Sequence, residues 1–127
     1  MITTMESRGL ILYAHGARDP RWAEPFERVL KRIRERQPSL PVALAFLDYL
    51  EPTLMTASQR LVEEGVEQIR VVPLFFGRGG HLREDLPRQM KAVCEAIPSA
   101  RFEIAEAAGE ADAVVEALAD FALSGIG

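Results

Sequence analysis

The chain has 127 residues, of which 48% are apolar and 27% are charged, and a formal net charge of −4. This length and composition are typical of one globular domain with its own core. The acidic balance argues against a general nucleic-acid binder or a protein that adheres to anionic membranes. We expect residues 1–127 to form a single domain, with residues 1–7 as a disordered extension.

Cysteine usage and the N-terminus bear on the cellular compartment. Cys94 is the single cysteine, which excludes an internal disulfide and a multi-cysteine zinc site. The first residues, MITTMESRG, lack the basic region and apolar stretch of a signal peptide. No apolar segment approaches the ~20 residues that a membrane helix needs. We therefore expect a cytoplasmic protein that does not span a membrane.

Short apolar runs that indicate strands recur along the chain. Buried strands are predicted at Leu10–Ala14, Val42–Leu47 and Gln68–Phe76. The alternating pattern of Arg101–Ala105 is typical of a half-exposed edge strand. Pro73 counts against a central strand because proline cannot donate a ladder hydrogen bond, so we expect strand pairing to end near it.

Helical patterns lie between and after these runs. Apolar residues recur at helical spacing in three segments, namely Phe26, Val29, Leu30 and Ile33, then Leu86, Met90, Val93, Cys94 and Ile97, and finally Val114, Leu118, Phe121 and Ala122. Asp19 and Pro20 are suited to the start of the first helix. Another helix is predicted from Thr53 to Glu64, with Gly65 as its C′ residue. The last helix is predicted from Glu110 to Leu123.

The resulting order is β-α-β-α-β-α-β-α. Alternation with short connections implies an α/β fold with three layers, in which helices cover both faces of a parallel sheet. With four strands we expect the spatial order 2-1-3-4, a flavodoxin-like half. In such a sheet, ligands bind beyond the carboxyl ends of the strands at the topological switch point, here between the first and third strands.

The two histidines of the chain flank this switch point. His15 follows the first strand in AHGARDP, and His81 follows the third strand in FFGRGGHLRED, so we expect both on the loops beside the crevice. Asp48 ends the second strand on the other side of the first. Two imidazoles and a carboxylate suit Co, Ni, Fe or Zn ions, and three protein ligands leave open positions on the metal.

Structural roles are the alternative for each of these residues. A histidine at a strand end is often a hydrogen-bonded turn residue, and Asp48 or Glu51 could cap the following helix. The glycines Gly77, Gly79 and Gly80 either adopt positive φ in a tight turn or let the backbone approach a bulky, flat ligand. The motif GRGG does not match a P-loop, because it has no GK[ST] at the required spacing.

Several other side chains could have either a structural or a functional role. Arg18, Arg78 and Arg83 are either solvated surface charges or line the crevice and pair with carboxylates. Trp22 and the methionines fit core or rim packing. Cys94 lies on the apolar stripe of its helix, which favours a core residue over a nucleophile.

Three segments carry a resemblance to a known family. LILYAHGARDP, VALAFLDYLEPTL and VVPLFFGRGGHLREDLP resemble the signature segments of the CbiX/SirB-type class II chelatases, the sirohydrochlorin cobaltochelatases and ferrochelatases. The resemblance runs in order from about Gly9 to Phe121. A single domain of this length is similar to the short form of the enzyme, which the resemblance implies to be a homodimer; longer members fuse two such domains.

The resemblance implies a role for particular residues. His15 and His81 match the histidines that hold the incoming metal ion and help to take protons from the macrocycle. Asp48 stands where many members have a glutamate, which keeps the charge but shortens the reach. Beyond the resemblance, we expect Gly79 and Gly80 to let the macrocycle approach the backbone, and Arg18, Arg78 and Arg83 to pair with its carboxylates. Where many members continue Gly-x-His after the fourth strand, this chain has Gly109, Glu110 and Ala111.

The implied activity is that of a lyase of tetrapyrrole biosynthesis. It would insert a divalent metal into sirohydrochlorin on the route to cobalamin or sirohaem. Cobalt is the expected metal, and nickel and iron are the alternatives. The metal would be a substrate, and no tightly bound cofactor is expected. The expected partners are the tetrapyrrole, the metal ion and a second copy of the chain. No nucleic-acid or membrane partner is expected. The alternative is a carrier of the same fold that holds a metal or tetrapyrrole without turnover.

Overall fold

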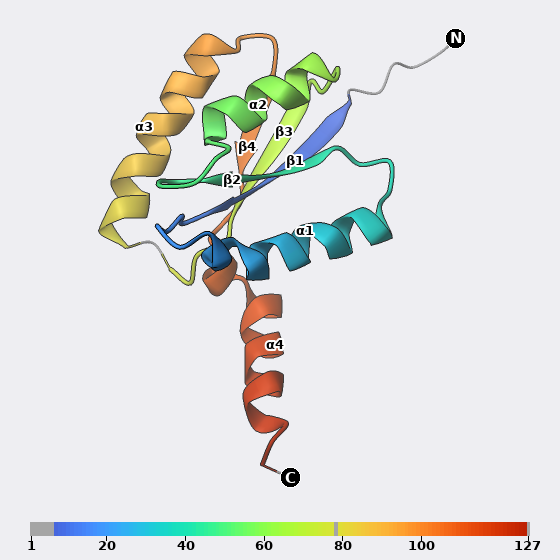
Figure 1. The fold of residues 1–127 in the computed structure, drawn as a ribbon, viewed down its shortest axis with the longest axis vertical. Helices are drawn as coiled ribbons and strands as arrows, with labels where there is room; N and C mark the ends of the chain where they lie inside the picture. Colours follow the sequence, from blue (N-terminus) through green and yellow to red (C-terminus); the bar gives the residue numbers. More distant parts are fainter. Residues whose placement is uncertain (1–6, 78, 127) are drawn as a thin grey trace.

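The computed structural model describes residues 7–77 and 79–126, without the side chains of residues 80 and 81. Its elements follow the predicted alternation (Figure 1). They are β1 (Arg8–Ala14), η1 (Pro20–Ala23), α1 (Glu24–Arg36), β2 (Val42–Phe46), α2 (Leu54–Glu63), β3 (Gln68–Pro73), α3 (Gly80–Ala96), β4 (Arg101–Ile104), η2 (Ala108–Glu110) and α4 (Asp112–Leu123).

The four strands form one parallel sheet in the order β2-β1-β3-β4. This order confirms the predicted fold class and places the switch point between β1 and β3. Strand β1 pairs with β2 from Leu10 opposite Val42 to Ala14 opposite Phe46. It pairs with β3 up to Tyr13 opposite Pro73, so the proline stands where regular pairing ends, as predicted.

Helices cover both faces of the sheet, so the core has two parts. On one face α2 and α3 enclose the larger cluster, in which Ile11, Tyr13, Ile69 and Val71 are fully buried. On the other face α1 packs on β1 and β2, with Leu12 and the other strand residues meeting its half-buried apolar side. Strand side chains alternate between the two faces, and both faces are covered at β1 and β2, which explains why these two strands are nearly continuous apolar runs.

Two predicted helix signals are confirmed, namely Asp19 at the start of η1 and Gly65 after α2, whereas the N-cap of α2 is Thr53. Asp19 caps the 3-10 helix η1, where its carboxylate accepts a hydrogen bond from the Arg21 N–H. Hydrogen bonds from the side chain of Arg21 and from its backbone N–H lower the pKa of Asp19. Thr53 caps α2 by accepting a hydrogen bond from the Thr56 N–H, and Gly65 follows that helix with φ of +96°.

One residue of the predicted apolar stripe of α1 and one of that of α3 are exposed. Val29 lies on the outer flank of α1 with 41% of its surface exposed, since Phe26, Leu30 and Ile33 alone face the sheet. Cys94 is also exposed, because Val93 and Met90 occupy the buried side of α3 and the next residue along is turned about 100° away. Helical spacing alone does not show whether a residue lies at the centre of an apolar stripe, where it is buried, or at its margin, where it is exposed.

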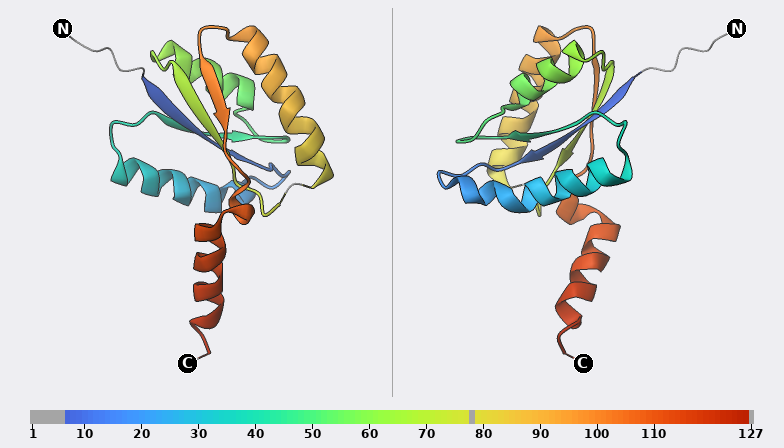
Figure 2. Two further views of the ribbon diagram at one scale, coloured as in Figure 1. Left: turned by 180° about the vertical axis from the view of Figure 1, so that it is seen from behind. Right: turned by 45° about the vertical axis from the view of Figure 1, so that its right-hand side comes forward.

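The last helix departs most from the expected layering. Figures 1 and 2 show α4 extending away from the sheet instead of covering it. None of its residues is buried. Gly109, in the turn before it, packs so closely under the carbonyl of Phe76 that an added Cβ would lie 1.8 Å from that oxygen. Within residues 7–77 and 79–126, no helix has the length and apolarity needed to cross a bilayer.

Candidate active site

His15 lies directly after β1, at the carboxyl edge of the sheet. Its ring is half-buried and stands edge-on to the ring of Phe75, with 4.4 Å between the centroids. Its carbonyl oxygen accepts a hydrogen bond of 2.9 Å from the indole N–H of Trp22. Trp22 is therefore a rim residue that fixes the backbone of the histidine, and Phe75 fixes its ring.

The loop after β2 brings Asp48 to the loop that follows His15. The carboxylate Oδ1 of Asp48 accepts a 3.0 Å hydrogen bond from the N–H of Gly16. A Cβ added at Gly16 would lie 1.7 Å from the carbonyl oxygen of Asp48, so only glycine allows this approach. The reading of Asp48 as a helix cap is wrong, because Thr53 caps α2; Glu51 instead accepts from the Thr53 N–H.

Tyr49 adjoins this contact in a backbone conformation that is unusual for its type. Its φ is +62°, and 68% of its surface is exposed. The guanidinium of Arg18 lies 5.8 Å from the centre of its ring, within the range of a cation–π contact. Strained non-glycine backbone of this kind clusters at functional sites. The loops after β1 and β2 thus present an arginine and an aromatic ring beside His15.

The second histidine is not on a loop, and that part of the prediction is wrong. His81 is the second residue of α3, because the helix begins at once after Gly79, which adopts the extended conformation of an N-cap. Gly80 is the first residue of the helix. Arg78 and the side chain of His81 lie outside the described part of the structure. The backbone places His81 after β3, on the side of the switch point opposite His15.

The glycines before α3 are not explained by a tight turn that needs positive φ. Neither Gly77 nor Gly79 has a positive φ, and a Cβ added at either would meet nothing within 4 Å. The space around them is compatible with the approach of a flat ligand. Arg83 is exposed and borders a hollow of about 220 Å³ between α3 and β4, which His15 and Asp48 do not line.

A hydrogen-bonded chain runs from the buried Tyr13 through half-buried groups to the loop of Asp48. The hydroxyl of Tyr13 donates to Oε1 of Gln89 at 2.8 Å, and Nε2 of Gln89 donates to the carbonyl of Leu47 at 3.4 Å. This chain ties β1 and α3 to the residue before Asp48. Burial raises the pKa of the Tyr13 hydroxyl, and the carboxylates of Asp85 and Asp48 raise it further.

We expect Tyr13 to remain protonated where an exposed tyrosine ionises, near pH ~10. Since its pKa is raised only in the folded state, its contribution to stability is present below that pH and declines as the pH rises above it. Absorbance of phenolate near 295 nm, compared with that of the Tyr13→Phe variant, checks this. If the absorbance difference between the wild type and Tyr13→Phe titrated near pH ~10 while both proteins are folded, Tyr13 would not be a buried hydrogen-bond donor.

The structure brings part of the predicted metal site together. His15 and Asp48 lie on adjoining loops joined through Gly16. Among the side chains that the structure describes, no three His, Cys, Asp or Glu groups converge as a metal cluster. Gly16, Phe75, Tyr49 and Gln89 were not predicted. Only Gly16 had a sequence signal, since a glycine directly after a site histidine indicates close packing.

The geometry defines a chelatase-like α/β protein, with a parallel sheet and a histidine at its switch point. The CbiX family model matches residues 9–123, so the chain belongs to the CbiX family. A sirohydrochlorin cobaltochelatase from Sulfolobus acidocaldarius is 34% identical over 110 residues, which cover 87% of this chain and 85% of that relative.

Solved structures support the same family. A CbiX protein from Marinobacter aquaeolei VT8, described as a protein of cobalamin (vitamin B12) biosynthesis, superposes with a TM-score of 0.81 at 32% identity, covering 94% of this chain and 97% of that one. The sirohydrochlorin chelatase SirB from Bacillus subtilis subspecies spizizenii, in complex with cobalt, gives 0.72 at 27% identity. The match covers 91% of this chain and 49% of that one.

Proposed function

We propose that this protein is a sirohydrochlorin metal chelatase, a lyase that inserts a divalent metal ion into the macrocycle. The observation that carries the proposal is His15 at the switch point of a chelatase-like sheet, with the carboxylate of Asp48 on the adjoining loop. Membership of the CbiX family supports sirohydrochlorin as the substrate, because the Sulfolobus relative is named a sirohydrochlorin cobaltochelatase. We further propose that residues 1–127 work as a single chelatase-like domain in the cytoplasm.

Cobalt is the metal that we propose as the substrate. The Sulfolobus relative is named a cobaltochelatase, and the SirB structure holds cobalt. Nickel and iron accept the same imidazole and carboxylate ligands, so they are the alternatives to test. The metal is consumed by the reaction, and we propose no tightly bound cofactor.

We propose that His15 and His81 hold the ion over the macrocycle and accept the two protons that the pyrrole nitrogens lose. Neutral imidazole suits both tasks, because it is a metal ligand and its pKa in solution lies near neutrality. The edge-on contact of His15 with Phe75 limits rotation of the ring. Asp48 adds negative charge beside the ion, and its hydrogen bond to the Gly16 N–H fixes one of its oxygens.

The substrate carries carboxylates around its rim, and arginines suit them as charge-assisted partners. Arg18 is the best placed described arginine, since it lies beside Tyr49 on the loops that flank His15. We retain Arg78, Gly79, Gly80 and Arg83 as proposed contacts at the start of α3. The open space at Gly79 supports a close approach of the ring.

We propose that two copies form the working unit. This chain covers about half of SirB, 49% of its length, so that chelatase has room for a second region of similar size. In a homodimer, a second copy would take the place of that region.

Substitution of Asp48 tests the metal role. Asp48→Asn keeps an oxygen that accepts from the Gly16 N–H but removes the charge, so we expect the KM for cobalt to rise by about 10-fold or more. Glu51→Gln is the matched control, because Glu51 is a carboxylate of the same loop that accepts from the backbone of Thr53. An equal effect of the two substitutions on KM would contradict a metal contact at Asp48.

Turnover distinguishes the enzyme from a carrier. With sirohydrochlorin and cobalt in large excess over protein, an enzyme converts many equivalents of macrocycle, which its absorbance spectrum reports. A carrier gives at most one equivalent per site and then stops. A burst of one equivalent followed by the spontaneous rate would overturn the proposal in favour of a binding module.

A further inference from the structure

A buried tyrosine hydroxyl lies two residues before His15 and takes no part in the proposed reaction. The side chain of Tyr13 is fully buried on the face of the sheet that α2 and α3 cover. Its hydroxyl donates to Oε1 of Gln89 on α3 at 2.8 Å. Phenylalanine would fill the same space without placing a polar group there, so packing alone does not account for the hydroxyl.

Gln89 uses both ends of its side-chain amide. Its Nε2 donates to the carbonyl oxygen of Leu47 at 3.4 Å, while its Oε1 accepts from Tyr13. A carbonyl oxygen only accepts hydrogen bonds, so the NH₂ group must face Leu47, which leaves the amide oxygen for the hydroxyl. One orientation of the amide thus satisfies both partners, and it joins α3 to segments that lie 42 and 76 residues away in the sequence.

Two of the joined segments lead directly to proposed metal ligands. The ring of Tyr13 lies 5.9 Å, between centroids, from that of Phe75, which contacts the ring of His15 at 4.4 Å. Leu47 directly precedes Asp48 at the start of the loop after β2. The two hydrogen bonds of the amide therefore reach the chain within two residues of both groups.

The third segment, α3, carries His81 as its second residue, about two turns before Gln89. Apolar side chains hold this helix on the sheet, but apolar attraction is non-directional. The chain before the helix adds few contacts at its glycines, since a Cβ at Gly77 or Gly79 would meet nothing within 4 Å. Hydrogen bonds depend steeply on distance and angle, so the amide of Gln89 adds a fixed point for the helix relative to the two loops.

Stability alone does not explain the hydrogen-bonded pair. Replacing both partners of a buried hydrogen bond by apolar groups of the same shape is often nearly neutral, whereas removing one partner leaves the other unpaired. Phenylalanine and methionine have nearly the shapes of tyrosine and glutamine without their polar atoms. A fold that required only packing would accept them at positions 13 and 89.

We propose that Tyr13 and Gln89 are positioning residues of the chelatase site. Their hydrogen bonds hold α3 and the start of the Asp48 loop at a fixed spacing from the strand that ends before His15. They act through the residues that hold the metal and contact neither the metal nor the macrocycle themselves. The inference rests on the proposed function and extends it to two side chains behind the site.

The double variant Tyr13→Phe with Gln89→Met separates positioning from stability. It removes both hydrogen bonds and leaves neither side chain with an unpaired polar atom, so urea denaturation should give nearly the wild-type midpoint. We expect kcat for cobalt insertion to fall by about 10-fold or more, and the Kd for cobalt to rise by a similar factor, as for other groups that orient metal ligands. The Kd comes from titrating the folded protein with Co²⁺ alone, without the macrocycle.

The single variants test whether the two side chains act together. Gln89→Met leaves the buried hydroxyl of Tyr13 unpaired, so it should be less stable than the double variant. Tyr13→Phe alone should lower kcat by about 3-fold or more, as expected for one hydrogen bond. The kcat of the double variant should lie within about 2-fold of that of Gln89→Met, because loss of the amide already removes both links. Fold-changes that multiply would mean that the residues act independently, which overturns the pair.

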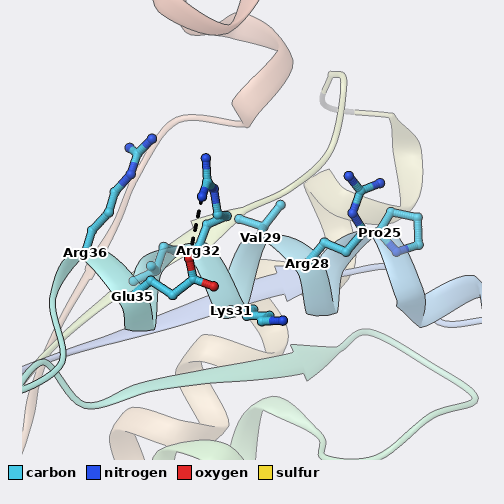
Figure 3. A pocket seen from close by; sticks show the side chains of 8 residues that line it. Pro25, Arg28, Val29, Lys31, Arg32, Glu35 and Arg36 are labelled. Carbon is cyan, nitrogen blue, oxygen red and sulfur yellow. Dashed lines mark hydrogen bonds and ion pairs between the residues drawn. The ribbon is translucent and has the colours of Figure 1, made fainter.

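Two control variants lie toward the amino edge of the sheet, away from the site. Val66 is buried against Gly9, so Val66→Ala should destabilise the fold and leave kcat and the cobalt Kd unchanged. Figure 3 shows the ion pair between Arg32 and Glu35 beside a hollow of about 740 Å³ that α1 lines. Glu35→Gln removes this pair in the last turn of α1, which leads to the amino end of β2, and should also change neither value.

The outcomes separate this inference from the proposed function. A double variant with the wild-type kcat and cobalt Kd overturns the positioning role, and so does Val66→Ala with the same losses as the double variant. A wild-type protein that does not accelerate cobalt insertion overturns the chelatase proposal, and the cobalt Kd then decides alone whether the pair positions the metal ligands. A wild type that binds no cobalt overturns both. If the double variant does not fold, Tyr13→Phe decides, and an unchanged kcat and Kd overturn the inference.

Discussion

Replacing both histidines, His15→Ala with His81→Ala, should remove nearly all of the protein's acceleration of cobalt insertion into sirohydrochlorin. We expect the rate to fall by about 100-fold or more, since a positioned acid or base typically contributes 10²–10⁴-fold. Metal affinity should fall as well, because the proposed site loses both of its imidazoles. The absorbance change of the macrocycle on metal insertion gives the rate.

The controls for this result are the rates of the two single variants and a test that the double variant folds. The two single variants should each lose less than the double variant, and circular dichroism should match that of the wild type. His15 is half-buried and its ring touches Phe75, so His15→Gln tests whether loss of packing contributes. A double variant with the wild-type rate would refute the roles of both residues.

Gly16→Ala should destabilise the protein strongly. The new Cβ would lie 1.7 Å from the carbonyl oxygen of Asp48, which is backbone and cannot rotate aside. The loops after β1 and β2 would have to separate, and the hydrogen bond from the Gly16 N–H to Asp48 would break. We expect the free energy of unfolding to fall by about 2–4 kcal/mol.

Urea denaturation measures this change, with Gly77→Ala as the matched control. A Cβ at Gly77 meets nothing within 4 Å, and its φ is not positive, so the same substitution there should leave stability unchanged or raise it by less than about 1 kcal/mol. Equal stabilities of Gly16→Ala and the wild type would mean that the two loops do not approach as closely as the structure shows.

The sequence predicts the sheet because its signals are local and repeated. Three strands are short apolar runs and the fourth alternates, and residues such as Asp19 and Gly65 mark where a helix begins or ends. Parallel strands with short connections then leave few possible strand orders. The position of His15 follows from that order alone, since it is the first residue after β1.

The remaining features depend on contacts that no local pattern encodes. Val29 and Cys94 have the spacing of core residues, yet the position of the sheet relative to α1 and α3 leaves them exposed. The contact of Gly16 with Asp48 joins residues far apart in sequence. His81 lies in the first turn of α3 and not on a loop, because Gly79 is the N-cap of that helix. The amphipathic pattern of α4 predicts a buried stripe but does not say which surface covers it.

The central claim is that this protein accelerates insertion of a divalent metal into sirohydrochlorin. The most direct measurement is the initial rate of cobalt insertion under anaerobic conditions, followed by the macrocycle spectrum, with and without purified protein at a catalytic concentration. The account predicts a rate that rises in proportion to protein and exceeds the spontaneous rate. A rate equal to the spontaneous one with cobalt, and likewise with nickel and iron, would contradict it.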